Sequence, residues 1–401
     1  MPYLFHTENG FSLIHSTAKN GVFYQSFTSP YSTKPIQIFP QNTANYSACM
    51  DASNNLCVAV SPDPFHLNYY TYENNRFIKN VLVANQNSNY MLSYPVVYNL
   101  PSQNTFSIVY LSHQAHTEIY KFIIEIPCTH QQTSLLTLST NPYLIKSYLT
   151  NDSLWIFFIT SDTCYHLQAL QITDKQPLLY TYIHLNEPII DYSICINEEL
   201  VHITYVSELH GKYQLSYFNP SYKTLTHLLI TPTPCNPAVF SYYNMIWIHV
   251  MLSHHLQMML SIDYGQSFSN PTPCSIQNNV CRSFFLTQKI SPFVGQELYA
   301  SIASTPKLCT LAMIDFPKFH SDSRISPELE LLIEGFLLSL ENTKMQPSIQ
   351  VGSDSYHNSS TQKTPSTDDT LSVHNLNTPS LEQAKANFMQ DLAGWDLQPK
   401  L

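Results

Sequence analysis

Short apolar stretches recur at an even spacing along most of the chain. They begin at Phe11, Leu56, Phe106, Leu154, Leu200, Ile246 and Leu298, so successive starts lie 45 to 52 residues apart. Most follow a tight polar turn, and all are apolar almost throughout. This pattern predicts a strand in each unit that is buried on both faces.

Each apolar stretch has a similar neighbourhood. Another strand precedes it, and a strand with polar and apolar residues in alternation follows it, as at residues 65–70, 118–122 and 213–217. A more variable fourth strand often comes next, as at residues 178–183. Four short antiparallel strands in each unit of this length are typical of propeller blades. A pair of β-sandwiches is the rival fold, but it would not need so even a spacing.

We therefore expect an all-β fold, a six- or seven-bladed β-propeller over residues 1–320 built from four-stranded antiparallel blades. The seventh unit is the weakest, because no clear fourth strand follows residues 307–313. Either a strand from elsewhere closes the ring, or the propeller has six blades.

One hairpin turn in the sixth unit carries a recognisable pattern. Asp263 can accept hydrogen bonds from the turn, Gly265 can adopt a positive φ angle, and the hydroxyls of Ser261 and Ser267 can bind the same turn. Phe268 returns an aromatic ring to the core. An ordinary Asp/Gly hairpin in another all-β protein would also fit these residues.

The pattern Ser-x-Asp-x-Gly-x-Ser-Phe at residues 261–268 resembles the Asp-box of sialidases and related propellers. The resemblance implies a turn between the third and fourth strands of a blade, remote from any catalytic centre. The unit spacing places residues 261–268 at that point.

The same resemblance raises the question of sialidase activity. Enzymes of that family hold the substrate carboxylate with three arginines, because the guanidinium group recognises planar anions. The chain has only Arg76, Arg282 and Arg324, and Arg324 lies past the predicted blades. No catalytic residue can be carried over. Whether the chain is an enzyme stays open, and a non-catalytic role is favoured.

The C-terminal part differs in kind from the repeats. Residues 326–343 begin with Ser-Pro-Glu, a good helix start, and carry an apolar stripe that would pack on the propeller or self-associate. Residues 344–377 are rich in polar residues and are predicted to be a disordered linker. Residues 378–397 are predicted to form an amphipathic helix that docks on a protein partner or on this molecule, or else a fraying tail. Its apolar stripe is Leu381, Ala384, Phe388, Leu392 and Trp395.

Composition limits the partners, the location and the cofactors expected of this chain. The formal net charge is −10, and charged residues make up only 11% of the chain, so nucleic acid is not an expected partner. The N-terminus lacks the features of a secretory signal and no apolar run approaches the ~20 residues of a membrane span, so a cytoplasmic location is expected. The nine cysteines have no CxxC spacing and are expected to be reduced. No metal or cofactor is predicted, because His113 with His116 and His254 with His255 lack further ligands.

Two functions follow from these observations. The first is a protein-interaction scaffold whose C-terminal helices mediate docking. The second is a glycan-binding or glycan-processing propeller, in which Tyr69, Tyr70 and Tyr72 stack on sugar rings. Alternatively, side chains of that strand face the neighbouring blade.

Overall fold

The computed structural model describes residues 1–309, except residues 8, 18–20, 29–30, 42–44, 52, 85–88, 101–104, 151, 174–175, 198–199, 243–244, 275–277, 288–292 and 303–305. Residues Met1–His320 form one compact unit. The predicted helices at 326–343 and 378–397 and the predicted linker at 344–377 lie outside the described residues. Their docking residues therefore stay predictions.

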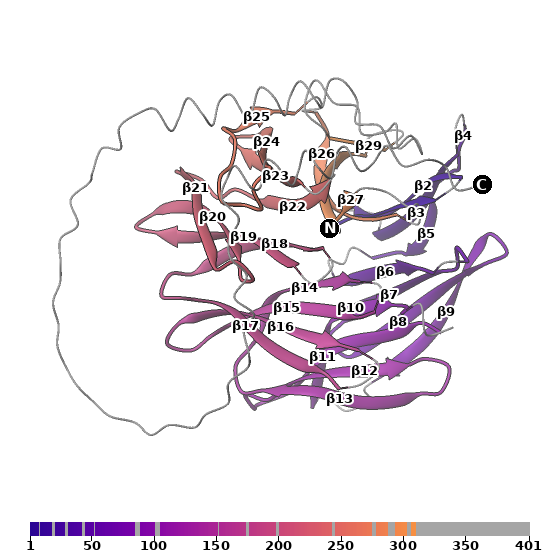
Figure 1. Cartoon of the computed structure of the whole chain (residues 1–401). Helices are drawn as coiled ribbons and strands as arrows, with labels where there is room; N and C mark the ends of the chain where they lie inside the picture. Colours follow the sequence, from indigo (N-terminus) through magenta and orange to yellow (C-terminus); the bar gives the residue numbers. More distant parts are fainter. Residues whose placement is uncertain are drawn as a thin grey trace, which may run out of the picture. The chain divides into compact units, whose positions relative to one another are not determined.

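Every regular element of the described residues is a β-strand, and six sheets follow one another along the chain (Figure 1). Four of them have four strands, and strands near the end of the described chain enlarge the first sheet to eight and the sixth to five. The first sheet holds β1 (Tyr3–Thr7), β2 (Gly10–Thr17), β3 (Gly21–Thr28) and an outer strand split into β4 (Tyr31–Ser32) and β5 (Ile36–Phe39). The second holds β6 (Tyr46–Met50), β7 (Leu56–Asp63), β8 (His66–Glu73) and β9 (Arg76–Ala84). The third holds β10 (Tyr90–Tyr98), β11 (Ser107–Gln114), β12 (Tyr120–Ile126) and β13 (Gln131–Leu138).

The other three sheets repeat the same antiparallel order. The fourth holds β14 (Tyr143–Leu149), β15 (Leu154–Ser161), β16 (Tyr165–Ile172) and β17 (Leu178–Leu185). The fifth holds β18 (Ile189–Asn197), β19 (Leu200–Leu209), β20 (Lys212–Asn219) and β21 (Thr224–Thr231). The sixth holds β22 (Pro237–Tyr242), β23 (Met245–Leu252), β24 (His255–Ser261) and β25 (Thr272–Pro273). Six of the seven apolar stretches seen in the sequence are the second strands of these sheets, so that prediction is confirmed for them. The seventh, which starts at Leu298, belongs to the closing segment instead.

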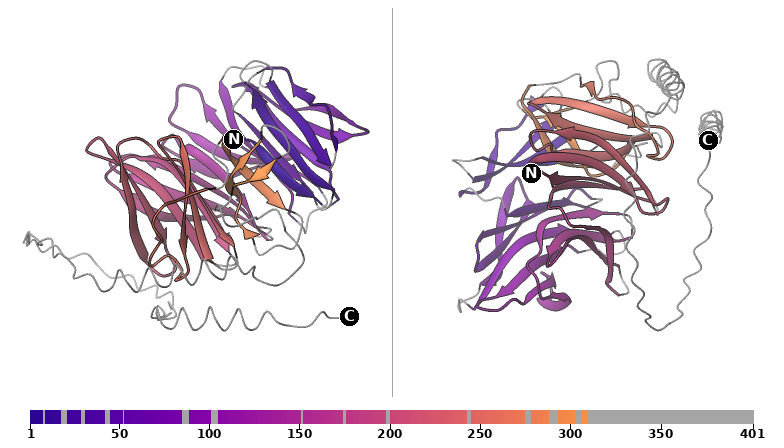
Figure 2. Two further views of the ribbon diagram at one scale, coloured as in Figure 1. Left: turned by 90° about the horizontal axis from the view of Figure 1, so that it is seen from above. Right: turned by 90° about the vertical axis from the view of Figure 1, so that its left-hand side faces the viewer.

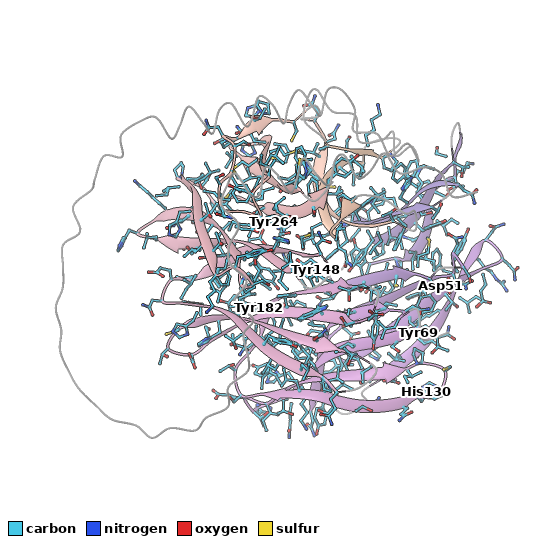
Figure 3. All side chains as sticks on the ribbon, in the orientation of Figure 1. Asp51, Tyr69, His130, Tyr148, Tyr182 and Tyr264 are labelled. Atoms are coloured by element: carbon cyan, nitrogen blue, oxygen red, sulfur yellow. The ribbon has the colours of Figure 1, made fainter. Side chains whose placement is uncertain are left out.

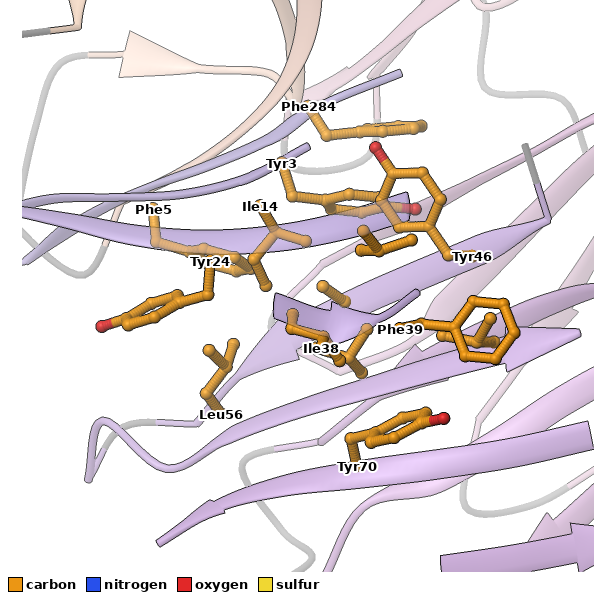
Figure 4. Packing of buried hydrophobic residues seen from close by; sticks show 14 residues of the cluster. Tyr3, Phe5, Ile14, Tyr24, Ile38, Phe39, Tyr46, Leu56, Tyr70 and Phe284 are labelled. Atoms are coloured by element: carbon orange, nitrogen blue, oxygen red, sulfur yellow. The ribbon is translucent and has the colours of Figure 1, made fainter. Parts of the chain in front are cut away.

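Successive sheets pack face to face and share their cores. Five separate apolar clusters join the first sheet to the second, the second to the third, and so on to the sixth. The cluster between the first two sheets is the one drawn in Figure 4, where Tyr24 and Ile14 of the first sheet face Leu56 and Tyr70 of the second. Four-stranded sheets stacked in chain order are the architecture of a β-propeller.

The last unit closes the ring without forming a blade of its own. Its strand β26 (Val280–Thr287) pairs in parallel with β1, with Tyr3 opposite Phe284, and so extends the first sheet. Strands β28 (Glu297–Ser301) and β29 (Lys307–Leu308) continue that sheet, whereas β27 (Phe293–Val294) pairs with β22 of the sixth. Figure 2 shows these orange strands beside the indigo strands of the first sheet. The described chain thus has six sheets, and the closing segment adds strands to the first and the sixth of them.

Burial falls from the middle of each sheet to its outer edge. The second strand β15 is buried along seven of its eight residues, because sheets cover both of its faces. The outer strands are far more open, since the first four residues of β17 are all exposed and β21 has no buried residue. The second strands therefore supply the core, and the outer strands supply much of the surface.

Candidate functional site

The turn at Asp263 is a buried structural element between β24 and β25. The Asp263 carboxylate accepts hydrogen bonds from the Ser261 hydroxyl at 2.8 Å and from the Ser267 amide at 3.0 Å and hydroxyl at 2.5 Å. The Gly265 amide donates to the Ser261 hydroxyl at 2.8 Å. Both carboxylate oxygens of Asp263 accept hydrogen bonds from residues of the turn, so this side chain stabilises the turn.

The same turn also locks the sixth sheet to the fifth. The Thr226 hydroxyl donates to the Gly265 carbonyl at 2.9 Å, and the Phe268 ring packs edge-on against Tyr217 at 5.0 Å. Gly265 has a φ of 88°, and a Cβ there would lie 2.0 Å from the Tyr217 ring. Glycine is required at this position both by the backbone and by the neighbouring ring.

A cluster of four charged side chains is buried where β14 and β18 meet β26 and β28. Arg282 donates to Asp191 at 2.6 Å and forms a second ion pair with Glu297. Lys146 lies 2.9 Å from Asp191 and 3.7 Å from Glu297. The cluster holds two cations and two anions, so their formal charges cancel.

Tyrosines complete this cluster. The Tyr148 hydroxyl, whose residue is labelled in Figure 3, donates to Glu297 at 2.6 Å, and Arg282 also donates to the Tyr192 carbonyl at 2.6 Å. Burial, reinforced by the Glu297 carboxylate, raises the pKa of Tyr148 well above its usual value. Tyr148 therefore stays protonated and acts as a donor.

The electrostatics of the cluster fix its ionisation. Burial lowers the pKa of the Lys146 ammonium, and the nearby Arg282 adds to this effect. Burial alone would raise the pKa of Asp191, but Lys146 and Arg282 hold it below its ordinary value. Asp191 and Glu297 are thus each paired with both cations of the cluster.

Two of the three arginines lie among the described residues, in different surroundings. The two terminal nitrogens of Arg282 donate to Asp191, Glu297 and the Tyr192 carbonyl. Its Nε atom has no hydrogen-bond partner. Arg76 is exposed at the start of β9. These two arginines are not brought together, so the described residues hold no arginine set for a substrate carboxylate.

The tyrosines proposed to stack on sugars do not form an open platform. Tyr70 is buried in the core shared with the first sheet. Tyr72 packs against Tyr24 of that sheet, with ring centroids 5.0 Å apart. Tyr69 is half-buried against the third sheet. These side chains face neighbouring blades, as the alternative in the sequence analysis expected.

Of the histidines singled out in the sequence, His113 has well-defined contacts. His113 is held by the Thr117 carbonyl at 2.7 Å and stacks on Tyr120 at 4.3 Å. Across the described part of the chain, no three His, Cys, Asp or Glu side chains already surround one metal position. The nine cysteines are free thiols.

The described surface carries apolar side chains along two outer strands. Leu178 and Leu179 of β17 are 49% and 46% exposed, and Leu225 and Ile230 of β21 are 50% and 66% exposed. Each strand is the last of its sheet (Figure 1). A small cavity of about 30 Å³ among the described residues is lined by Tyr3, Tyr98 and Gln296 among others, and water is the only ligand that fits it.

Sequence reasoning missed the four-charge cluster. Its members Lys146, Asp191, Arg282 and Glu297 are spread over four strands of three sheets, so no spacing reveals them. The available signal was the rarity of charge: Asp191 and Arg282 each interrupt a stretch of mostly apolar residues in a chain with few charges.

Comparisons with known proteins place the chain in no family. No family model matches it, and no curated protein matches it. Similar solved structures include the SapL1 lectin in complex with alpha methyl fucoside (7% identity, 67% of this chain and 93% of that chain, TM-score 0.42) and the fucose-specific lectin from Aleuria aurantia (10%, 68% and 94%, 0.41). Hydrazine synthase from Kuenenia stuttgartiensis is another (9%, 64% and 75%, 0.44). These TM-scores lie below 0.5, so they assign neither a family nor a ligand.

No helix able to span a membrane occurs among the described residues.

Proposed function

We propose that the chain is a non-catalytic β-propeller that binds another protein along the outer strands of its fourth and fifth sheets. The observation that carries this proposal is the character of β17 and β21. Neither strand contains Asp, Glu, Lys or Arg, and both expose large apolar side chains.

Outer strands commonly carry charged residues, because their edges could otherwise pair with other chains. The last strand of a sheet presents unpaired N–H and C=O groups, and proteins commonly protect such edges with charged side chains or proline. Strand β9 follows that rule, since it carries Arg76 and Lys79. Strands β17 and β21 do not, so an extended or amphipathic segment of a partner can add to them with both backbone and apolar contacts.

The experiment is affinity capture from native extract, followed by binding with the purified partner. The double variant Leu179→Lys and Ile230→Lys places one charge on each outer strand and should abolish retention of a partner that the natural chain holds. The matched control is Val81→Lys, because Val81 is 52% exposed on the charged strand β9. A partner lost equally with Val81→Lys, or kept by the double variant, contradicts the proposal.

The same capture experiment with a shortened chain tests the C-terminal segment. A chain ending at Thr343 lacks the predicted docking helix with Phe388 and Trp395. If that helix contributes to docking, the shortened chain should lose partner affinity even though β17 and β21 are unchanged.

A second candidate function is glycan binding, and a specific surface favours it. Tyr180 is 36% exposed and continues an aromatic row, with Trp155 at 5.5 Å and Tyr182 at 6.1 Å. The Tyr180 hydroxyl donates to Gln171 at 3.1 Å. An aromatic face beside an amide is suited to a sugar ring. A glycan array followed by titration of tryptophan fluorescence tests this, with loss of binding expected in Tyr180→Ala.

The same proposal includes a relation to Asp-box propellers and a cytoplasmic location. The first is supported by the five matching positions from Ser261 to Phe268 and by the hydrogen bonds of Asp263. The second is supported by the free state of all nine cysteines, which suits a reducing compartment.

A further inference from the structure

Two histidines that are far apart in sequence meet on the outer half of the fourth sheet. His166 of β16 and His184 of β17 lie directly opposite each other in the strand register. Their Nδ1 atoms share a hydrogen bond of 3.1 Å, in which one imidazole donates and the other accepts, and their ring centroids are 4.6 Å apart. His184 is exposed and the His166 side chain is 22% exposed, so the pair is open to solvent.

We propose that His166 and His184 bind a divalent transition-metal ion of the zinc, copper or nickel class through their Nδ1 atoms. Imidazole nitrogen is a preferred ligand of these ions. With Zn–N distances of about 2.0–2.1 Å in tetrahedral geometry, two ligating nitrogens lie roughly 3.3 Å apart. The two Nδ1 atoms are already within a few tenths of an ångström of that separation.

Asp162 orients the His166 ring so that its Nδ1 atom can bind the metal. Its Oδ1 atom lies 3.4 Å from the His166 Nε2 atom, which is the nitrogen on the far side of the ring from His184. A carboxylate at this position favours the tautomer with a proton on Nε2 and a free lone pair on Nδ1. Metal-binding histidines are commonly oriented in this way.

Asp162 is itself fixed by the β15–β16 turn. Its Oδ1 atom accepts hydrogen bonds from the Thr163 amide at 2.5 Å and the Cys164 amide at 3.1 Å. The local turn, the carboxylate and the histidine therefore form one arrangement directed at His184.

The protein supplies two ligands, and the remaining positions are open to water. Because no third ligand is in place in the described structure, the ion binds as a two-histidine complex. Such an ion would tie β17 to β16 across the outer edge of the sheet.

The fifth sheet provides a natural comparison. His227 lies on β21, the strand that corresponds to β17, but the residue opposite it is Ser216. The Ser216 hydroxyl lies 3.1 Å from the His227 Nδ1 atom. This histidine has no imidazole partner, so the proposal predicts no metal site there.

The test is calorimetric titration of the full-length, chelator-treated protein with Zn²⁺. The natural chain should bind one ion at this site, and His184→Thr and His166→Thr should each weaken binding at least tenfold. His227→Thr is the matched control and should bind as the natural chain does. Asp162→Asn should weaken binding about 10- to 100-fold, the usual cost of losing a supporting carboxylate.

Two further measurements keep the result interpretable. Far-ultraviolet circular dichroism of each metal-free variant should match that of the natural chain, which excludes misfolding. Bound Zn²⁺ should raise the Tm of the natural protein and of His227→Thr but not that of His184→Thr. Absence of Zn²⁺ binding to the natural chain, binding unchanged in His184→Thr, or binding lost with His255→Thr would overturn the proposal.

Discussion

Individual residues show how this chain uses its few charges. Arg282, Lys146, Asp191 and Glu297 occupy the interior, and the Glu297 side chain is fully buried. A buried charge is costly unless it is paired and hydrogen-bonded, and each of these four is both. Their arrangement depends on all members being present.

Arg282→Met should therefore destabilise the protein strongly. It leaves Asp191 and Glu297 with only Lys146 as a counter-charge, and breaking a buried pair in this way costs about 3–5 kcal/mol. Urea unfolding followed by fluorescence measures the free energy of unfolding. The control Arg76→Met removes an exposed arginine and should change it by less than about 0.5 kcal/mol. Equal effects of the two substitutions would show that the cluster is not the source of stability.

Two buried histidines should make the protein sensitive to acid. Burial lowers the pKa of His202 to about 4 and that of His249 to about 3, whereas both titrate near 6.5 when unfolded. Between these values the unfolded state binds more protons, so stability falls as the pH drops below 6.5. From pH 7 to pH 5 each histidine should remove about 2 kcal/mol.

Urea unfolding at several pH values tests this expectation. His202→Gln and His249→Gln should each reduce the loss between pH 7 and pH 5, whatever their effect at pH 7. A slope that stays the same in both variants would mean that other groups control the acid response.

The turn at Gly265 gives a residue-level test with an internal control. Gly265→Ala should cost about 3 kcal/mol, because a Cβ there meets the Tyr217 ring and the φ of 88° strains any other residue. Gly211→Ala has a similar φ of 73° but open space around it, so it should cost only about 1 kcal/mol. Thermal unfolding of both variants compares them directly. Equal Tm shifts would contradict the role of Tyr217.

At the level of elements, the sequence predicted the second strands of the sheets better than the outer strands. The second strands were visible because burial on both faces requires apolar residues throughout, as in β15 and β19. The outer strands were less clear, since one face is exposed and tolerates many residues. The turn at Asp263 was predictable because its hydrogen bonds are local.

The candidate sites were hidden because they depend on pairing across strands. His166 and His184 are 18 residues apart and meet only through the β16–β17 register, which contains a bulge between Leu167 and Gln168. Local spacing instead singled out His113 and His116, which the structure does not join. Register over a whole hairpin decides such contacts, and it is set by the turn and by neighbouring sheets.

At the level of the whole propeller, the first strand and the closing segment complete the ring. Strand β26 pairs with β1, and the rings of Tyr3 and Phe284 stack with centroids 5.0 Å apart. Sequence spacing indicated seven units, but a parallel pairing between the two ends of the propeller cannot be seen in a local pattern. The closing segment joins the first sheet because β1 leaves an edge that β26 can pair with.

This closure should appear as coupling between residues 281 positions apart in the chain. Tyr3→Ala and Phe284→Ala each remove part of the core in Figure 4 and should each cost about 3–5 kcal/mol. The double variant should lose less than their sum, by about 0.5–1.5 kcal/mol, because the ring contact is removed only once. Tyr3→Ala combined with Phe122→Ala, whose ring lies in the core between the third and fourth sheets, should be additive within about 0.5 kcal/mol. Denaturant unfolding of the three single and two double variants yields both couplings. Equal coupling in the two pairs would mean that the Tyr3–Phe284 contact does not hold the ring closed.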